Sequence, residues 1–273
     1  MRPWVEPRLE RRERGEKHPV DDFLFDYYPY SPHKLLTWHP GFGVTLEGDA
    51  HDFLAYEEYE VVPDGVRVVP GRLVDPHGRL ALVLRILAGM SEREAMTGCF
   101  GLHEWAMVYG LQQGEVRHSR LPLRLVPDDI RGTVDAMGLR CTHVDAYRFF
   151  TPEAVARNAY EPTRAAQPDF DQPGCLHANM DLYKYAMWFS PFVCSDLIAD
   201  AFELARAARD LDMQASPYDC TAYGLEPIQV ETAQGRAEYS RRQREIMAVA
   251  EPLRTDLISA LSGLNTAIRG LVA

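Results

Sequence analysis

Polar and apolar residues follow two different periods along the chain, and each period predicts a different kind of element. Residues 56–75, YEEYEVVPDGVRVVPGRLVD, alternate with a period of two on both sides of Pro63-Asp64-Gly65, which predicts a β-hairpin. Elsewhere apolar residues recur at the spacing of an amphipathic helix. The predicted helical segments are 79–96, 98–109, 127–137, 176–212, 232–250 and 252–271.

Local signals refine the ends of these helices. Gly89 predicts a break in 79–96, and Ser91 followed by Glu94 predicts a capping box that starts a new helix. Gly138 is expected to end the 127–137 helix, because glycine is common just after a helix. Thr151 is expected to cap a helix that begins at Pro152. Ser190-Pro191 interrupts the long 176–212 segment.

The remaining apolar runs are short and predict further strands. These runs are 121–126, 139–150 and 227–231. Together with the hairpin they predict an α+β fold, predominantly helical, in a single domain over 1–273 with a small β-sheet. Residues 1–20 are expected to form a polar arm, and the helices of 232–273 to serve as scaffold.

Composition narrows the class of protein. The chain has 273 residues, of which 46% are hydrophobic, enough for a substantial core. It has no apolar run of about 18 residues that would span a bilayer, and its charged start is unlike a secretory signal. A soluble, cytoplasmic protein that does not bind membranes is expected.

Charge and motifs exclude further classes. The net charge of −11 disfavours nucleic acid as a partner, because phosphate neutralisation supplies most of that affinity. Neither GxGxxG nor GxxxxGK[ST] occurs, so no nucleotide cofactor is expected. The five cysteines are widely spaced without a CxxC pair, which argues against a zinc finger or a disulfide framework. Cys141 and Cys175, each two residues before a histidine, can approach a site.

Histidines and acids occur together in three places. His143 and Asp145 lie two apart on an expected strand, so their side chains share one face. His177 and Asp181 lie four apart on an expected helix, again on one face. His103-Glu104 and His118 are candidates to complete the same polar pocket.

These residue types predict a metal site. Two histidines and one carboxylate suit non-haem iron, and three such ligands with a water suit zinc. The candidate ligands are His143, His177, His103 and His118, and the candidate catalytic carboxylates are Asp145, Asp181 and Glu104. Asp210 and Asp212 are two apart on a helix, so they are expected on different faces and exposed to solvent.

Two alternatives remain for the histidines. A desolvated Asp145 or Asp181, held by a neighbouring histidine, can activate water without a metal. His143 and His177 can also be hydrogen-bonded core residues with no chemistry.

Several runs of the sequence resemble one actinobacterial family. The runs are RGEKHPVDDFLFDYYPYSP (14–32), LTWHPGFGVTLEG (36–48), CFGLHEWAMVYG (99–110), CTHVDAYRFFTPEA (141–154), QPGCLHANMDLYKYA (172–186) and DLDMQASPYD (210–219). The family commonly carries the label "3-methyladenine DNA glycosylase". The resemblance implies a DNA-repair enzyme that removes alkylated purines by cleaving the bond between base and sugar, and it supplies no catalytic residues.

Three functions follow in order. The first is a metal-dependent enzyme, with iron or zinc, acting on a small-molecule substrate. The second is the alkylpurine N-glycosylase that the resemblance implies, although the sequence has no helix-hairpin-helix motif of the LPGVGxxTA kind. The third is a non-catalytic binding or scaffold protein.

Overall fold

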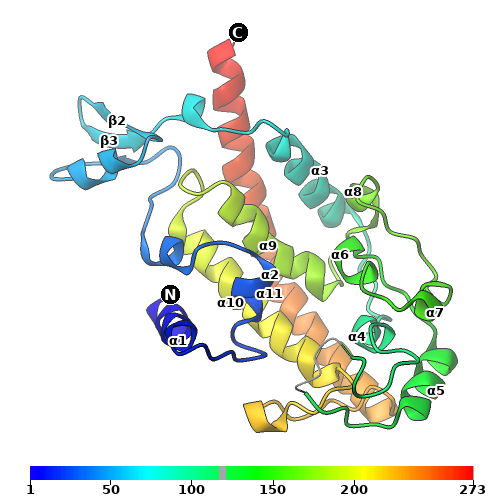
Figure 1. Ribbon diagram of the computed structural model, residues 1–273. Coiled ribbons are helices and arrows are strands. Elements are labelled where there is room, and N and C mark those ends of the chain that lie inside the picture. Colours follow the sequence, from blue (N-terminus) through cyan, green and yellow to red (C-terminus); the bar gives the residue numbers. More distant parts are fainter. Residues whose placement is uncertain (117–120, 273) are drawn as a thin grey trace. The chain divides into compact units, whose positions relative to one another are not determined.

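The protein is mainly helical with one small sheet, as the sequence predicts (Figure 1). The computed structural model describes residues 1–116 and 121–272. Helices make up 55% of the structure and strands 5%. The helices are α1 (Arg2–Glu13), α2 (Phe23–Tyr27), α3 (Arg79–Glu92), α4 (Leu102–Ala106), α5 (Pro127–Met137), α6 (Val144–Tyr147), α7 (Pro152–Val155), α8 (Gln167–Phe170), α9 (Leu176–Trp188), α10 (Ser195–Ala215) and α11 (Ala233–Val272). The strands are β1 (Thr45–Leu46), β2 (Tyr59–Val62) and β3 (Gly65–Val68).

Contacts between residues divide the chain into two compact units. Unit 1 comprises Met1–Ala88, Asp181–Ala205 and Glu251–Ala273, and unit 2 comprises Gly89–Met180 and Arg206–Ala250. Helices α3, α9, α10 and α11 each contribute residues to both units. The single domain expected from the sequence stays a prediction.

Unit 1 contains the predicted hairpin. Strands β2 and β3 pair antiparallel with Val62 opposite Gly65, and β1 pairs with the other edge of β3. Gly65 is required here, because a Cβ atom would lie 2.0 Å from the Leu46 carbonyl oxygen. Inward-facing Tyr59 and Val66 pack in a small core with Phe192, which gives the sheet its buried face.

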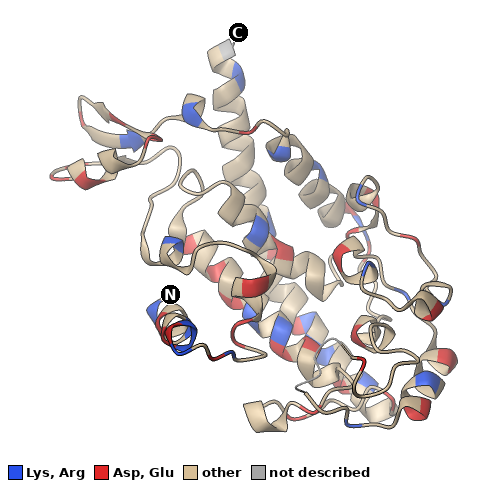
Figure 2. Ribbon diagram, viewed as in Figure 1, with Lys and Arg blue, Asp and Glu red and all other residues tan. Residues whose placement is uncertain are grey.

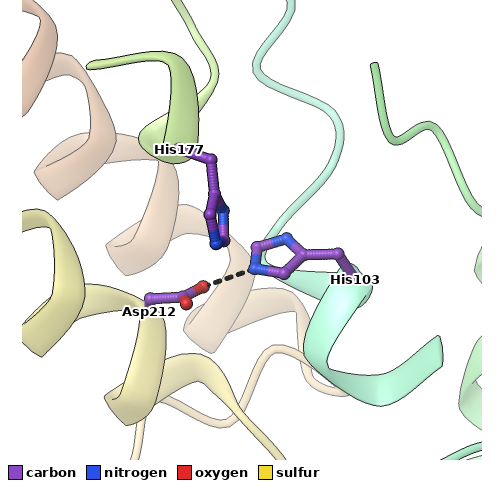
Figure 3. Close-up of side chains that lie close together, drawn as sticks. All are labelled: His103, His177 and Asp212. Atoms are coloured by element: carbon purple, nitrogen blue, oxygen red, sulfur yellow. Dashed lines mark ion pairs between the residues drawn. The ribbon is translucent and has the colours of Figure 1, made fainter. Parts of the chain in front are cut away.

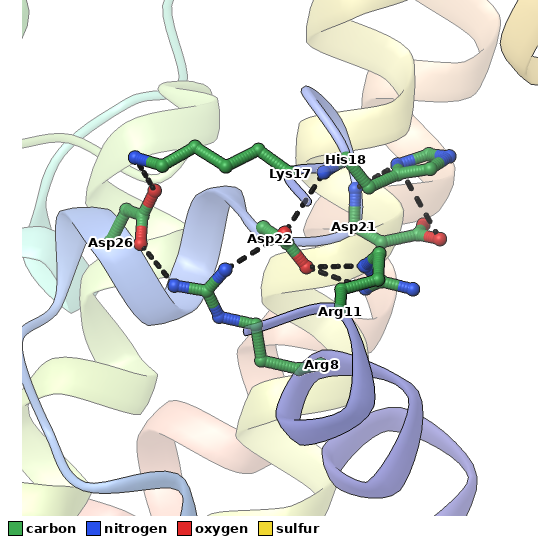
Figure 4. A network of polar contacts seen from close by, with 7 residues as sticks. All are labelled: Arg8, Arg11, Lys17, His18, Asp21, Asp22 and Asp26. Atoms are coloured by element: carbon green, nitrogen blue, oxygen red, sulfur yellow. Dashed lines mark hydrogen bonds and ion pairs between the residues drawn. The ribbon is translucent and has the colours of Figure 1, made fainter. Parts of the chain in front are cut away.

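Ion pairs hold the polar N-terminal helix in unit 1 (Figure 4). Asp22 is 2% exposed and accepts hydrogen bonds from Arg8 Nη1 at 2.8 Å and Arg11 Nη2 at 2.5 Å. Burial raises the pKa of Asp22, but the bonds from Arg11 and the His18 amide and the charge of Arg8 bring it below its usual value. Figure 2 shows both signs of charge together on α1. The expected arm is therefore a docked helix.

Several helix boundaries match their predicted signals. Helix α5 ends at Gly138, which has a φ of 69°. Thr151 caps α7 by accepting a hydrogen bond from the Ala154 amide at 3.3 Å. Helices α9 and α10 are separated around Ser190-Pro191, whose peptide bond is cis. These are positions where one side chain or one backbone conformation decides the ending.

Two expected helix breaks are wrong. Helix α3 continues through Gly89 to Glu92, and no helix begins at Ser91. Glycine fits there because a Cβ atom at position 89 would lie 2.9 Å from the Pro168 carbonyl oxygen. Helix α11 likewise continues through Pro252, so the two predicted C-terminal helices are one helix of 40 residues.

Three expected strands are also wrong. Segment 121–126 contributes only the isolated bridge of Leu123 with Tyr218, and 227–231 has no regular structure. In segment 139–150 a bridge at Leu139 is followed by α6, with His143 at its N-cap. Short apolar runs are buried in either structure, so periodicity cannot separate them.

None of the described helices is both long enough and apolar enough to cross a membrane.

Candidate metal centre

Three buried side chains in unit 2 converge on one point (Figure 3). His103 comes from α4, His177 from the first turn of α9, and Asp212 from α10. One ligand atom of each residue lies within 4.8 Å of the others. The residues are 5%, 4% and 0% exposed, respectively, so bulk water does not screen their interactions. We call these residues the triad.

Tight backbone packing places α4 against the end of α10. Phe100 and Gly101, just before α4, both have a left-handed φ, of 50° and 71°. A Cβ atom at Gly101 would lie 3.1 Å from the Ala215 Cβ. Trp105 donates its indole N–H to the Ala215 carbonyl at 2.9 Å. His103 is thereby directed toward the α10 turn that carries Asp212.

His103 and Asp212 form a buried ion pair. His103 Nε2 lies 2.7 Å from Asp212 Oδ1. Burial lowers the pKa of His103, but the charge and hydrogen bond of Asp212 raise it well above its usual value. Burial raises the pKa of Asp212, and the opposing effect of His103 brings it below its usual value. In the absence of metal the pair is therefore an imidazolium with a carboxylate.

His177 is the neutral member of the triad. Its ring is perpendicular to that of His103, with the ring centroids 4.6 Å apart. Burial lowers the pKa of His177 well below its usual value, and the charge of His103 lowers it further. A neutral imidazole carries the lone pair that metal binding requires.

A second ion pair adjoins the triad. Arg209 is 2% exposed, and its Nη1 donates to Glu104 Oε1 at 2.8 Å and to Asp212 Oδ2 at 3.0 Å. Burial lowers the pKa of Arg209, and the two carboxylates raise it by a larger amount. The predicted residue Glu104 thus lies near the triad, in contact with a cation.

The other predicted residues have different surroundings. His143 is fully buried, and its ring stacks on that of His177 with centroids 5.3 Å apart. Asp145 forms ion pairs with Arg164 and Arg148. Because His143 caps α6, the expected shared strand face does not exist. His118 lies outside the described residues.

Asp181 belongs to unit 1. There its Oδ1 accepts a hydrogen bond from the Tyr28 hydroxyl at 2.7 Å, and its Oδ2 pairs with Lys184. Whether Asp181 meets His143 and Asp145 stays a prediction.

Asp212 was assigned to solvent, and that prediction is wrong. The residue is completely buried, whereas Asp210 is half-buried. The two acids do lie on different faces of α10, as their spacing requires. Asp212 follows the buried residues Ala205 and Ala208 by seven and four positions. An acid on such an apolar stripe is the signal that would have identified it.

The cysteines contribute little to the site. Cys99 Sγ lies 3.9 Å from His103 Nδ1. Burial raises the pKa values of Cys141 and Cys175, so both are protonated thiols, and metals bind thiolates. The two thiols that the sequence offered as candidates are therefore poor ligands.

Comparison with protein-family models, with curated proteins and with solved structures finds no match to this chain.

Proposed function

We propose that this chain is a metal-dependent enzyme in which His103, His177 and Asp212 hold a divalent iron or zinc ion. The observation that carries the proposal is that their ligand atoms lie within 4.8 Å of one another, although the residues are distant in sequence. Two imidazoles and one carboxylate form a ligand set for non-haem iron or catalytic zinc.

The electrostatics of the triad favour a cation. Asp212 remains ionised because its pKa is lowered, and His177 is neutral because its pKa is lowered as well. His103 must lose its proton to become a ligand, and its Nε2 already lies 2.7 Å from Asp212 Oδ1. A metal would thus replace the proton that these two atoms share.

Three protein ligands leave positions for water and substrate, as is typical of catalytic sites. A bound metal would supply a Lewis acid and would lower the pKa of a coordinated water. The burial of the triad strengthens every charge interaction within it.

A cavity of about 810 Å³ in unit 2 offers space for a small molecule. Phe100 lines this cavity and lies three residues before His103. Its ring packs edge-on against Tyr239, with centroids 6.3 Å apart. Tyr239 is buried and lies near Asp212, whose charge contributes to raising its pKa after burial. These two rings connect the wall of the cavity to the triad.

The first test is elemental analysis of the protein purified without added metal. The proposal expects about one iron or zinc ion per chain, and loss of this metal in His177→Ala. A protein without metal that also binds none on titration would contradict the proposal.

A second candidate is the alkylpurine N-glycosylase. The observation that favours it is the His103–Asp212 pair, a desolvated carboxylate beside a histidine, because such a pair can activate water for attack on a glycosidic carbon. Release of 3-methyladenine from alkylated DNA by metal-free protein, abolished in Asp212→Asn, would favour this candidate. Its absence in protein that contains metal would favour the first.

A further inference from the structure

Arg209 is a buried cation in contact with a candidate metal ligand. Its side chain is 3% exposed, and Nη1 lies 3.0 Å from Asp212 Oδ2 and 2.8 Å from Glu104 Oε1. A cation is an unexpected neighbour for a metal site, because like charges repel strongly where water is excluded. Its presence calls for a role that offsets this repulsion.

The contacts of Asp212 separate its two oxygens. Oδ1 lies 2.7 Å from His103 Nε2, whereas Oδ2 accepts a hydrogen bond from Arg209. Only Oδ1 is therefore directed toward a histidine of the triad. A carboxylate without such a bond can bind a metal through both oxygens.

Glu104 balances the charge of Arg209. Its Oε1 accepts a hydrogen bond from the same guanidinium nitrogen, and Glu104 is 3% exposed. With Asp212 ionised, the two carboxylates and the guanidinium carry one net negative charge. The triad can therefore attract a divalent cation despite the arginine beside it.

We infer that Arg209 is a positioning residue that restricts Asp212 to one ligating oxygen, so that a bound metal keeps open positions for water or substrate. Glu104 supplies the counter-charge that makes this arrangement compatible with a cation. The inference rests on the proposed metal site and assigns that site to the open, catalytic type.

The main test loads the protein with Co²⁺ and records its visible spectrum, which weakens as the coordination number rises. The variant is Arg209→Met combined with Glu104→Gln, which removes both charges and leaves no buried carboxylate without its cation. Release of Oδ2 is expected to raise the coordination number and weaken the visible bands. Metal affinity is expected to fall about 10–100-fold, as for other residues that orient a ligand.

Two single substitutions separate position from charge. Glu104→Gln retains an oxygen that accepts a bond from Arg209 but removes the counter-charge, so it is expected to weaken Co²⁺ binding without changing the spectrum. Arg209→Lys retains the charge on a less directional donor, so its spectrum is expected to lie between those of the wild type and the double variant.

The matched control is Arg124→Met combined with Glu231→Gln. This pair belongs to unit 2 and is joined at 2.5 and 2.8 Å, and among the described residues it makes no hydrogen bond to the triad. It is expected to leave the Co²⁺ spectrum unchanged. A wild-type spectrum and affinity in both Arg209 variants would overturn this inference alone, whereas a wild-type protein that binds no Co²⁺ would overturn the proposed function as well.

Discussion

At the scale of single residues, the proposal depends most on the charge of Asp212. Asp212 contributes one candidate ligand, pairs with His103 and accepts a hydrogen bond from Arg209. Asp212→Asn retains the shape of the side chain but removes its negative charge. We expect metal affinity to fall by at least about 100-fold, since a ligand should matter more than the residues that orient it. Calorimetric titration with Zn²⁺ measures the change.

Asp210→Asn is the matched control, because Asp210 lies two positions earlier on α10 and is half-buried. It removes the same charge from the same helix and is expected to retain wild-type affinity. Equal losses in both variants would point to a general effect of charge rather than to ligation.

A second residue-scale prediction concerns protons. The pKa of His103 is raised well above its usual value by Asp212, so His103 carries a proton at neutral pH without metal. A metal can bind Nε2 only after that proton leaves. Below the raised pKa, affinity should therefore increase about tenfold per pH unit, with one proton released per metal.

Calorimetry in buffers of different ionisation enthalpy counts these protons. Metal binding that releases none between pH 6 and pH 8 would show that His103 Nε2 is not a ligand. The same pair also affects stability without metal. The contribution of His103 is present below its unfolded pKa of about 6.5 and is lost as the pH rises through the folded value.

At the scale of elements, α1 depends on one buried carboxylate. Asp22 accepts hydrogen bonds from Arg8 and Arg11, so Asp22→Asn breaks a buried ion network. We expect it to lower the free energy of unfolding by about 3 kcal/mol, as measured by urea denaturation. The neighbouring Asp21→Asn, at a side chain 39% exposed, should change it by less than about 0.5 kcal/mol.

The pH dependence of this contact has a definite sign. The folded pKa of Asp22 is lowered, so its contribution is present above the unfolded value of about 3.9 and is lost as the pH falls through the folded value. A loss of stability equal in both variants, or independent of acid, would show that α1 does not depend on Asp22.

Much of the element pattern could be predicted, but the origin of the site could not. The hairpin, α5 and the cap at Thr151 depend on local signals that a sequence displays. His103 and His177 were identified by their type. Their partner Asp212 was missed, because convergence depends on tertiary packing such as the Trp105 bond to Ala215. His143 and Asp145 were placed on a strand because a short apolar run does not reveal its period.

At the scale of the whole molecule, charge opposes general DNA binding. The net charge is −11, and in the basic part of α11 Arg241 is paired with Glu238 and Glu245. We expect affinity for unmodified duplex DNA weaker than about 100 μM at physiological salt, the weak end of non-specific binding. Fluorescence anisotropy over a range of salt concentrations measures it. Micromolar binding with a steep salt dependence would instead indicate a basic surface.

The most direct test of the account is the location of a bound metal by anomalous diffraction from crystals grown with Zn²⁺. The account predicts one strong anomalous peak bonded to His103 Nε2, His177 and Asp212 Oδ1, with Asp212 Oδ2 still held by Arg209. A peak bonded to other residues, or an intact His103–Asp212 ion pair without any peak at saturating Zn²⁺, would contradict it.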